Sequence, residues 1–132
     1  MTNEELINEA ASLINVRADN GNLIGDVGCV LVSGKGNVYY GVCAAVGSNV
    51  FCAEQSAIGS MLTAGEYDVK KIVATWKDEK GNVFVIPPCG NCRQLMYQMN
   101  HANLDTDVIL DKAKLVKLRE LLPYYDWWKQ VS

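Results

Sequence analysis

Three thiols and one carboxylate occupy two short segments of the sequence. Cys52-Ala53-Glu54 supplies one thiol and the carboxylate, and Cys89-x-x-Cys92 supplies the other two thiols. Thiolates are good ligands for zinc, and three rather than four of them leave one coordination position open. Water held at an open position ionises near neutral pH. We therefore predict a hydrolytic Zn²⁺ centre with Cys52, Cys89 and Cys92 as ligands. Glu54 is expected to carry protons rather than to be a fourth ligand.

Each segment also has simpler explanations. Taken alone, the Cys89-x-x-Cys92 pair is as typical of a redox dithiol or of half of a structural zinc site as it is of a catalytic site. A carboxylate such as Glu54 near a helix start can be there only because the helix dipole favours it. Cys52 immediately upstream of Glu54 favours a catalytic metal, but a zinc-stabilised binding module without activity stays an alternative.

Both segments fall where helices are predicted to begin, over about 52–63 and from 89 or 90 to 101. A helix N-terminus carries partial positive charge and unpaired N–H groups, which favour the thiolate form of cysteine. Helix side chains lean towards the N-terminus, so Glu54 is expected to point into the same space as Cys52. Three thiolates leave a zinc site with net charge −1. We expect N–H···S bonds from segment 91–93 to offset this charge.

The remaining elements are predicted from hydrophobic periodicity and turn residues. Helices and strands in mixed order predict a three-layer α/β/α domain over residues 1–132, with a mixed sheet of about five strands and helices on both faces. Two further helices are predicted, at 2–17 with Thr2 as its cap and at about 115–121, and the five strands are predicted at 27–32, 38–42, 71–76, 83–86 and 108–110.

Composition excludes several classes of partner. The net charge is −3 and the sequence has no basic cluster, so nucleic acid is not expected as a partner and polynucleotide editing is disfavoured. The apolar runs are too short to span a membrane. The acidic segment 1–5 lacks the features of a signal peptide, which predicts a cytoplasmic protein. Five cysteines in a reducing compartment favour metal binding over disulfides.

The paired motifs resemble those of the cytidine deaminase family. They are Cys-Ala-Glu at 52–54 and Pro-Cys-Gly-x-Cys-Arg-Gln at 88–94, and Val27-Gly28 is similar to a further element of that family. Within the family, the spacing from Gly41 to Cys52 and the segment 119–123 before an aromatic tail are most similar to the blasticidin-S deaminase branch.

The resemblance implies a Cys₃ zinc site, with Glu54 as the general acid and base. It also implies hydrolytic loss of ammonia from a small aminopyrimidine such as cytidine, deoxycytidine or a blasticidin S-like nucleoside, with a modified or free base as an alternative. It further implies a homo-oligomer, most often a tetramer. Two positions depart from the family pattern. Cys43 and Ala45 replace an Asn-x-Glu pair that holds the sugar, and Gln55 replaces an arginine that offsets thiolate charge.

Candidate substrate contacts surround the first ligand. Phe51 is expected to stack on a planar base, and Ser48 to offer a polar contact. Cys43 is either a core thiol or part of the pocket wall, and Trp127 either seals the core or covers the pocket. Ala53, which lies between Cys52 and Glu54 in the sequence, is also a candidate substrate contact. Cys29 is expected to lie in the hydrophobic core.

Overall fold

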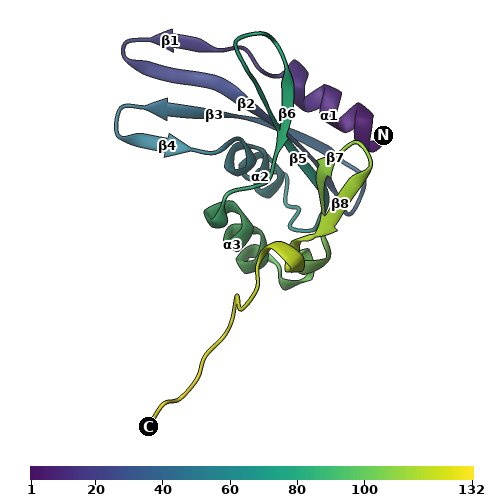
Figure 1. Cartoon of the computed structure of the whole chain (residues 1–132). Helices are drawn as coiled ribbons and strands as arrows, with labels where there is room; N and C mark the ends of the chain where they lie inside the picture. Colours follow the sequence, from purple (N-terminus) through teal and green to yellow (C-terminus); the bar gives the residue numbers. More distant parts are fainter.

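The computed structural model describes residues 1–132 as one twisted sheet of eight strands with helices packed on both faces (Figure 1). The three-layer α/β/α arrangement expected from the sequence is therefore confirmed. In chain order the elements are α1 (Asn3–Ser12), β1 (Arg17–Asp19), β2 (Asn22–Ser33), β3 (Val38–Val46), β4 (Asn49–Phe51), α2 (Ala53–Thr63), β5 (Val69–Lys77), β6 (Val83–Ile86), α3 (Gly90–Met99), a 3₁₀ turn (His101–Asp105), β7 (Asp107–Asp111), β8 (Lys114–Lys117) and a second 3₁₀ turn (Leu118–Leu121).

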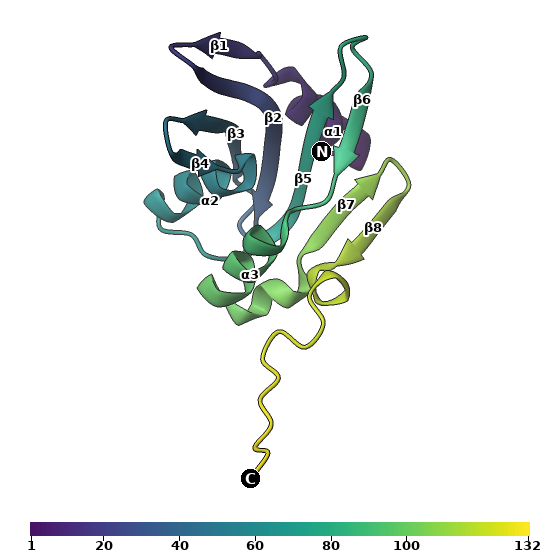
Figure 2. The same ribbon diagram turned by 60° about the vertical axis from the view of Figure 1, so that its left-hand side comes forward.

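The sheet is mixed because one of its strand pairs is parallel. The strand order is β4-β3-β2-β5-β7-β8, with β1 added to β2 and β6 added to β5. β5 and β7 run parallel, and the other pairs are antiparallel. β6 and β7 share one edge of β5, since β6 pairs with 74–77 and β7 with 71–72. Figure 2 shows β6 beside the upper part of β5 and β7 starting near its lower end. A short segment, 87–89, then connects β6 to α3.

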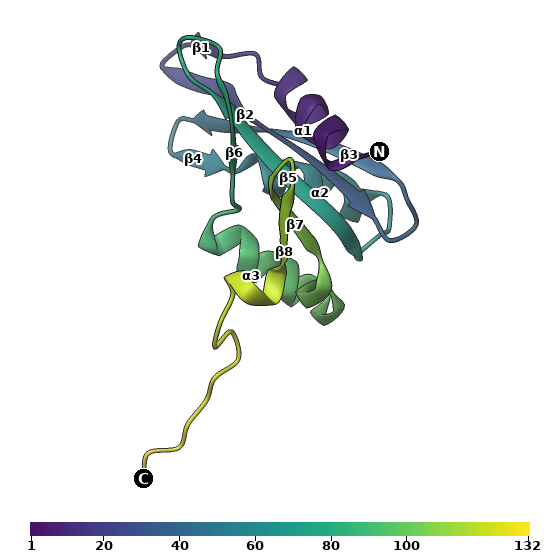
Figure 3. The same ribbon diagram turned by 45° about the vertical axis from the view of Figure 1, so that its right-hand side comes forward.

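Alternation along the strands builds two hydrophobic cores, one on each face of the sheet. Leu31 and Ile72 pack in the core that contains α2 and α3, together with Met96 of α3. Their neighbours Val30 and Val73 point the other way and pack against α1. Figure 3 shows α1 on one side of the strands and α3 on the other. Strands with apolar residues on both faces are therefore covered on both faces, as their continuous apolar runs predict.

The first helix is capped as expected but is shorter than predicted. The backbone N–H of Glu5 donates to Thr2 Oγ1 at 3.1 Å, which confirms the N-cap. The helix ends at Ser12, not at residue 17. The backbone N–H of Asn15 donates instead to Gly25 O at 3.1 Å, and 17–19 then pair with β2. Hydrogen bonds to the backbone of β2 therefore take the place of the bonds that would have continued the helix.

Two predictions about the sheet were wrong. The sheet has eight strands rather than about five, because β1, β4 and β8 were not predicted. The expected helix at 115–121 is a strand over 114–117 followed by a short 3₁₀ turn. Leu115 and Val116 lie opposite Ile109 and Val108 of β7. Pairing with an exposed sheet edge therefore outweighs the weak helical pattern of this segment.

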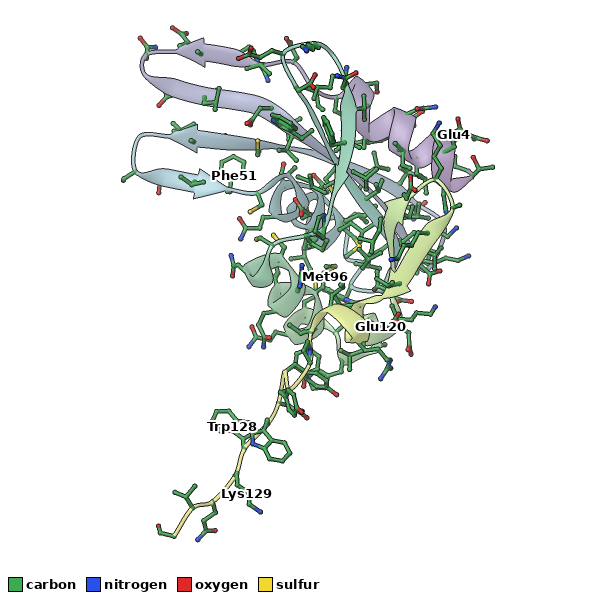
Figure 4. All side chains as sticks on the ribbon, in the orientation of Figure 1. Glu4, Phe51, Met96, Glu120, Trp128 and Lys129 are labelled. Carbon is green, nitrogen blue, oxygen red and sulfur yellow. The ribbon has the colours of Figure 1, made fainter.

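The C-terminal tail extends away from the domain in Figure 1. Trp127 is 66% exposed and Trp128 is 92% exposed, and Figure 4 shows Trp128 and Lys129 well separated from the helices and strands. No helix of the structure has the length and apolar character that crossing a membrane requires.

Candidate functional site

The three predicted ligands converge at the starts of two helices. Cys52 is the N-cap of α2, Cys89 is the N-cap of α3, and Cys92 lies in the first turn of α3. The Sγ atoms of Cys52 and Cys89 are 3.6 Å apart, and those of Cys89 and Cys92 are 3.4 Å apart. All three sulfur atoms lie within 4.8 Å of one another. The fold therefore brings together ligands that are 37 residues apart in the sequence.

This sulfur triangle fits a zinc ion. With Zn–S bonds of about 2.3 Å, two sulfur ligands of a tetrahedral ion lie about 3.8 Å apart. The observed separations of 3.4 and 3.6 Å are close to that edge and far too long for a disulfide. No other histidine, cysteine, aspartate or glutamate joins the group. The donor set is thus Cys₃, which leaves a fourth position for a non-protein ligand.

The environment favours thiolate at Cys89 in particular. Burial alone raises the pKa of Cys89, but the backbone N–H groups of Cys92 and Asn91 and the neighbouring thiols outweigh it, so the pKa is lowered. Burial raises the pKa of Cys52 and that of Cys92. The backbone N–H groups of segment 91–93 therefore favour the thiolate form of Cys89, but the thiol accepts no capping hydrogen bond, so the N–H···S bonds expected from this segment stay a prediction.

Glu54 lies beside the sulfur atoms and is almost completely buried, with 4% of its surface exposed. Burial raises the pKa of its carboxyl group, and a hydrogen bond from its own backbone N–H opposes this only in part. Its negative charge also helps to raise the pKa values of Cys52 and Cys92, and Glu54 lines the same cavity as Cys52 and Cys89. A buried carboxyl group of raised pKa can hold and release a proton near neutral pH.

Arg93 connects the second cysteine segment to the end of the folded domain. Its Nε donates to Pro88 O at 2.8 Å, and its Nη1 donates to Leu121 O at 3.0 Å. Pro88 directly precedes Cys89, so the planar guanidinium group holds the loop that carries this ligand. The arginine belongs to the recognised motif, but its role as a fixed link between two backbone segments is visible only in the structure.

A cavity of about 190 Å³ lies beside the thiols and Glu54. Cys52 and Glu54 form its polar end. A larger hollow of about 430 Å³, bordered by Lys35 and Glu66, contains no cysteine and lies apart from this cluster. The remaining cavity wall is mainly apolar and consists of Val27, Cys43, Val50, Phe51, Ala53, Ile86, Pro87 and Cys89.

The structure places some of the predicted substrate contacts in this cavity and not others. Phe51, Ala53 and Cys43 line it, and Phe51 is labelled in Figure 4 at the end of β4, next to α2. Ser48 lies in the exposed turn between β3 and β4 and is not part of the wall. Trp127 lies on the extended tail and does not cover the cavity of its own chain.

The other two cysteines differ in their surroundings. Cys29 is completely buried in the core with α2 and α3, as expected, and burial raises its pKa. Cys43 is only half-buried, and its thiol donates a hydrogen bond to Asp26 Oδ1 at 2.7 Å. Asp26 was not among the predicted residues. Gly25, the residue before Asp26, was the one feature of the sequence that pointed to this position, because an isolated glycine in a strand often marks a bulge.

The Cys₃ cluster and the buried glutamate lie within the part of the chain that matches a known family. The family model for the cytidine and deoxycytidylate deaminase zinc-binding region matches residues 1–105. The chain belongs to this family. The matched region includes the three thiols and Glu54, and the Cys₃ cluster fits the Zn²⁺ that this zinc-binding deaminase domain takes as its metal.

Similarity to individual deaminases supports the same assignment. The chain is 38% identical over 85 residues to blasticidin-S deaminase from Bacillus cereus, and this alignment spans 59% of the chain and 59% of that relative. The chain thus covers less than two thirds of the relative's length. The resemblance to this branch of the deaminase family that we expected from the sequence is confirmed.

Solved deaminase structures share the fold over nearly the whole chain. Cytidine deaminase from Burkholderia pseudomallei superposes with a TM-score of 0.73 at 28% identity, covering 93% of this chain and 98% of that one. Cytidine deaminase from Mycobacterium leprae superposes with a TM-score of 0.71 at 25% identity, covering 91% and 96%. The arrangement of sheet and helices is therefore that of the deaminase family.

Proposed function

We propose that this protein is a zinc-dependent hydrolase that removes the exocyclic amine of a cytosine-type nucleoside and releases ammonia. The observation that carries the proposal is a cluster of three thiols, two of which line one cavity together with the buried carboxylate of Glu54. A purely structural zinc site has four protein ligands, whereas a catalytic site keeps a position open. Here no fourth side chain approaches the sulfur atoms as a ligand.

Zinc bound by Cys52, Cys89 and Cys92 supplies a Lewis acid that lowers the pKa of water at its open position. The helix N-termini and the backbone N–H groups near Cys89 stabilise the thiolates that would hold the metal. The negative charge of the thiolates, which these groups stabilise, is present at every stage of the reaction.

Glu54 is the proposed general base and general acid. As a base it takes a proton from the attacking water, and as an acid it passes protons to the ring and to the departing amine, so that ammonia leaves and a carbonyl group remains. Its burial keeps bulk water away from the carboxyl group, and its raised pKa suits both directions of transfer.

The cavity wall favours a flat aromatic ring as the group next to the metal. Val27, Phe51 and Ile86 contribute apolar surface around the polar end. Cytidine, deoxycytidine and a blasticidin S-like nucleoside each carry such a ring with an exocyclic amine. A modified or free base remains the alternative substrate, because the cavity of one chain has room for little more than a ring.

We further propose that the protein acts as a homo-oligomer, with a tetramer as the preferred state. The cavity of about 190 Å³ is smaller than the roughly 300–1,000 Å³ of typical ligand sites. Its rim is apolar and open, since Val50 is 75% exposed and Phe51 is 41% exposed. The exposed Trp127 and Trp128 add apolar surface that an adjoining subunit would cover. Light scattering of the purified protein measures this directly.

Small molecules are the proposed substrates, and the cytoplasm is the proposed location. The five cysteines form no disulfide, and the zinc site requires reduced thiols, which suits a reducing compartment. The net charge of −3 disfavours nucleic acid as a substrate.

The alternative to an enzyme is a zinc-stabilised binding module, which would need the metal but not Glu54. The test compares wild type with Glu54→Gln for zinc content and for ammonia release. The substrates are cytidine, deoxycytidine, cytosine, blasticidin S and N-substituted cytosines. We expect equal zinc content, with ammonia release lost in the variant by at least 100-fold, the lower end of what a positioned acid–base group contributes (about 10²–10⁴-fold). Zinc-loaded wild type that releases ammonia from none of these compounds would support the module.

A further inference from the structure

A bulge in the central hairpin turns an acidic side chain towards the active-site face of the sheet. Ile24 of β2 pairs with Ala44 of β3, and the next pair is Gly28 with Val42. Residues 25–27 of β2 therefore lie opposite the single residue Cys43. Extra residues of this kind redirect side chains and often occur beside active sites.

The bulge is held in place by the segment after α1. Gly25 has φ of +81°, a conformation that favours glycine. A Cβ at Gly25 would lie 2.6 Å from Asn15 O, and the backbone N–H of Asn15 donates to Gly25 O at 3.1 Å. The conformation of the bulge is thus set by backbone contacts, and the following residue, Asp26, has a defined position before any ligand binds.

Asp26 lies next to two residues of the cavity wall and has one partner within the chain. The thiol of Cys43 donates to Asp26 Oδ1 at 2.7 Å, and both Cys43 and Val27, the residue after Asp26, line the cavity. Asp26 takes part in none of the ion pairs of the protein, and the bond from Cys43 is the only hydrogen bond to its side chain. Its second carboxylate oxygen is therefore available to an external hydrogen-bond donor.

Few polar side chains lie around this cavity. The thiols and Glu54 occupy the end where the amine would be lost, and the wall beyond them is mainly apolar. Cys43 and Ala45, the two β3 positions that differ from the family pattern, offer no oxygen acceptor. Asp26 supplies a carboxylate beside the same stretch of β3, from the neighbouring strand.

We propose that Asp26, oriented by Cys43, accepts hydrogen bonds from the substituent carried by the pyrimidine ring of the substrate. The inference rests on the proposed deaminase function and narrows its substrate class. The substrate is a cytosine ring whose substituent bears hydroxyl or ammonium donors, not a bare base. Asp26 is a specificity residue that contacts substrate, and Cys43 is a positioning residue that acts through Asp26.

The test compares substrates with and without donors on the substituent. Cytidine carries hydroxyl groups, 1-(2-aminoethyl)cytosine carries an ammonium group, and 1-methylcytosine carries neither. For Asp26→Ala we expect kcat/KM to fall about 10- to 100-fold through KM for a substrate with donors, and to change less than about twofold for 1-methylcytosine. A loss confined to 1-(2-aminoethyl)cytosine identifies ammonium as the recognised donor, and a loss with cytidine identifies hydroxyl. Calorimetric binding of the corresponding uracil products provides a second readout.

Matched variants separate recognition from folding. Asp19→Ala removes the same charge from an exposed position of the neighbouring strand β1 and should leave kcat/KM unchanged for all three substrates. Cys43→Ser keeps a donor for Asp26 and should retain discrimination, whereas Cys43→Ala should lose part of it. Zinc content and the thermal midpoint confirm that each variant is folded and metal-loaded.

Failure of the role proposed for Asp26 can be distinguished from failure of the proposed function. If wild type releases ammonia but Asp26→Ala lowers kcat/KM equally for all three substrates, or for none, the role of Asp26 is overturned while the proposed function stands. If zinc-loaded wild type releases ammonia from no aminopyrimidine, the proposed function and this inference are both overturned.

Discussion

Gly41 of β3 lies directly against the carbonyl group of Ala53 in the first turn of α2. A Cβ at Gly41 would lie 2.4 Å from Ala53 O and 2.4 Å from Ala57 N. Contacts this short with backbone atoms cannot be relieved by rotating a side chain. The absence of a side chain at residue 41 therefore sets how closely α2, which begins after Cys52, approaches the sheet.

Replacing this glycine should move the first ligand. We expect Gly41→Ala to lower the free energy of unfolding by about 1–3 kcal/mol, as overpacking does, and to weaken zinc binding because Cys52 shifts relative to Cys89. Urea unfolding and metal titration measure the two effects. Gly59→Ala, in the same helix with nothing within 4 Å of the added atom, is the control and should be neutral or stabilising by up to about 1 kcal/mol. Equal behaviour of the two variants would contradict the role of Gly41.

Arg93→Lys should weaken zinc binding without removing a ligand. Lysine keeps the charge but lacks the planar fork that donates to both Pro88 O and Leu121 O. Groups that orient metal ligands typically contribute 10- to 100-fold to metal affinity, so we expect a loss of about tenfold. Competition with a zinc chelator measures it. Lys70→Arg, a charge-conserving change at an exposed position, should have no effect. Unaltered affinity in Arg93→Lys would show that the loop needs only a positive charge.

Gln55 tests whether charge near the metal limits the reaction. Its Oε1 accepts the backbone N–H of Cys52 at 3.1 Å, and many relatives are expected to have arginine here. Arginine would offset thiolate charge, so Gln55→Arg should raise the rate of ammonia release and change its pH profile. Gln55→Leu loses the same hydrogen bond without adding charge and isolates that contribution. If both variants match wild type in rate and pH profile, position 55 has no electrostatic role.

Removing zinc should destabilise the fold, because the metal joins the start of α2 to the start of α3. A ligand present at about 1,000 times its dissociation constant stabilises the folded state by about 4 kcal/mol. We expect a chelator to lower the thermal midpoint of wild type but to have little effect on Cys89→Ser, which cannot complete the Cys₃ set. If the chelator lowered the thermal midpoint of Cys89→Ser as much as that of wild type, the result would argue against Cys89 as a ligand.

Glu66 should make stability depend on pH below neutrality. Hydrogen bonds from Tyr39, Ser33 and Asn37 lower its pKa, and only 8% of its surface is exposed. Because the folded pKa lies below the unfolded value of about 4.3, the stabilisation is present above that value and is lost as pH falls through the folded pKa. Wild type should therefore exceed Glu66→Gln in stability at pH 7, with the difference shrinking towards pH 3. Urea unfolding at both values measures this, and Glu79→Gln, at an exposed position, should show no such trend.

Features that depend on neighbours along the chain were predictable from the sequence alone. The cysteine spacing, the helix starts at Cys52 and Cys89 and the glycine-rich turn after β2 follow from short-range rules of capping, ligand spacing and turn formation. The apolar runs of β2 and β5 indicated strands covered on both faces, and the two cores confirm it. The three cysteines that the structure brings into one cluster were predicted as ligands from the same short-range rules.

Features that depend on partners far away in the chain were decided only by the tertiary structure. The strands β1, β4 and β8 are three or four residues long and exist because a sheet edge is there to pair with them. Asp26 lies beside Cys43 of the cavity wall because β2 bulges opposite β3, and Arg93 reaches the carbonyl oxygen of Leu121 only in the folded chain. The free energy of pairing between distant segments leaves no pattern in the local sequence. The sequence therefore specifies which atoms can bind the metal, whereas the fold decides which side chains surround the cavity.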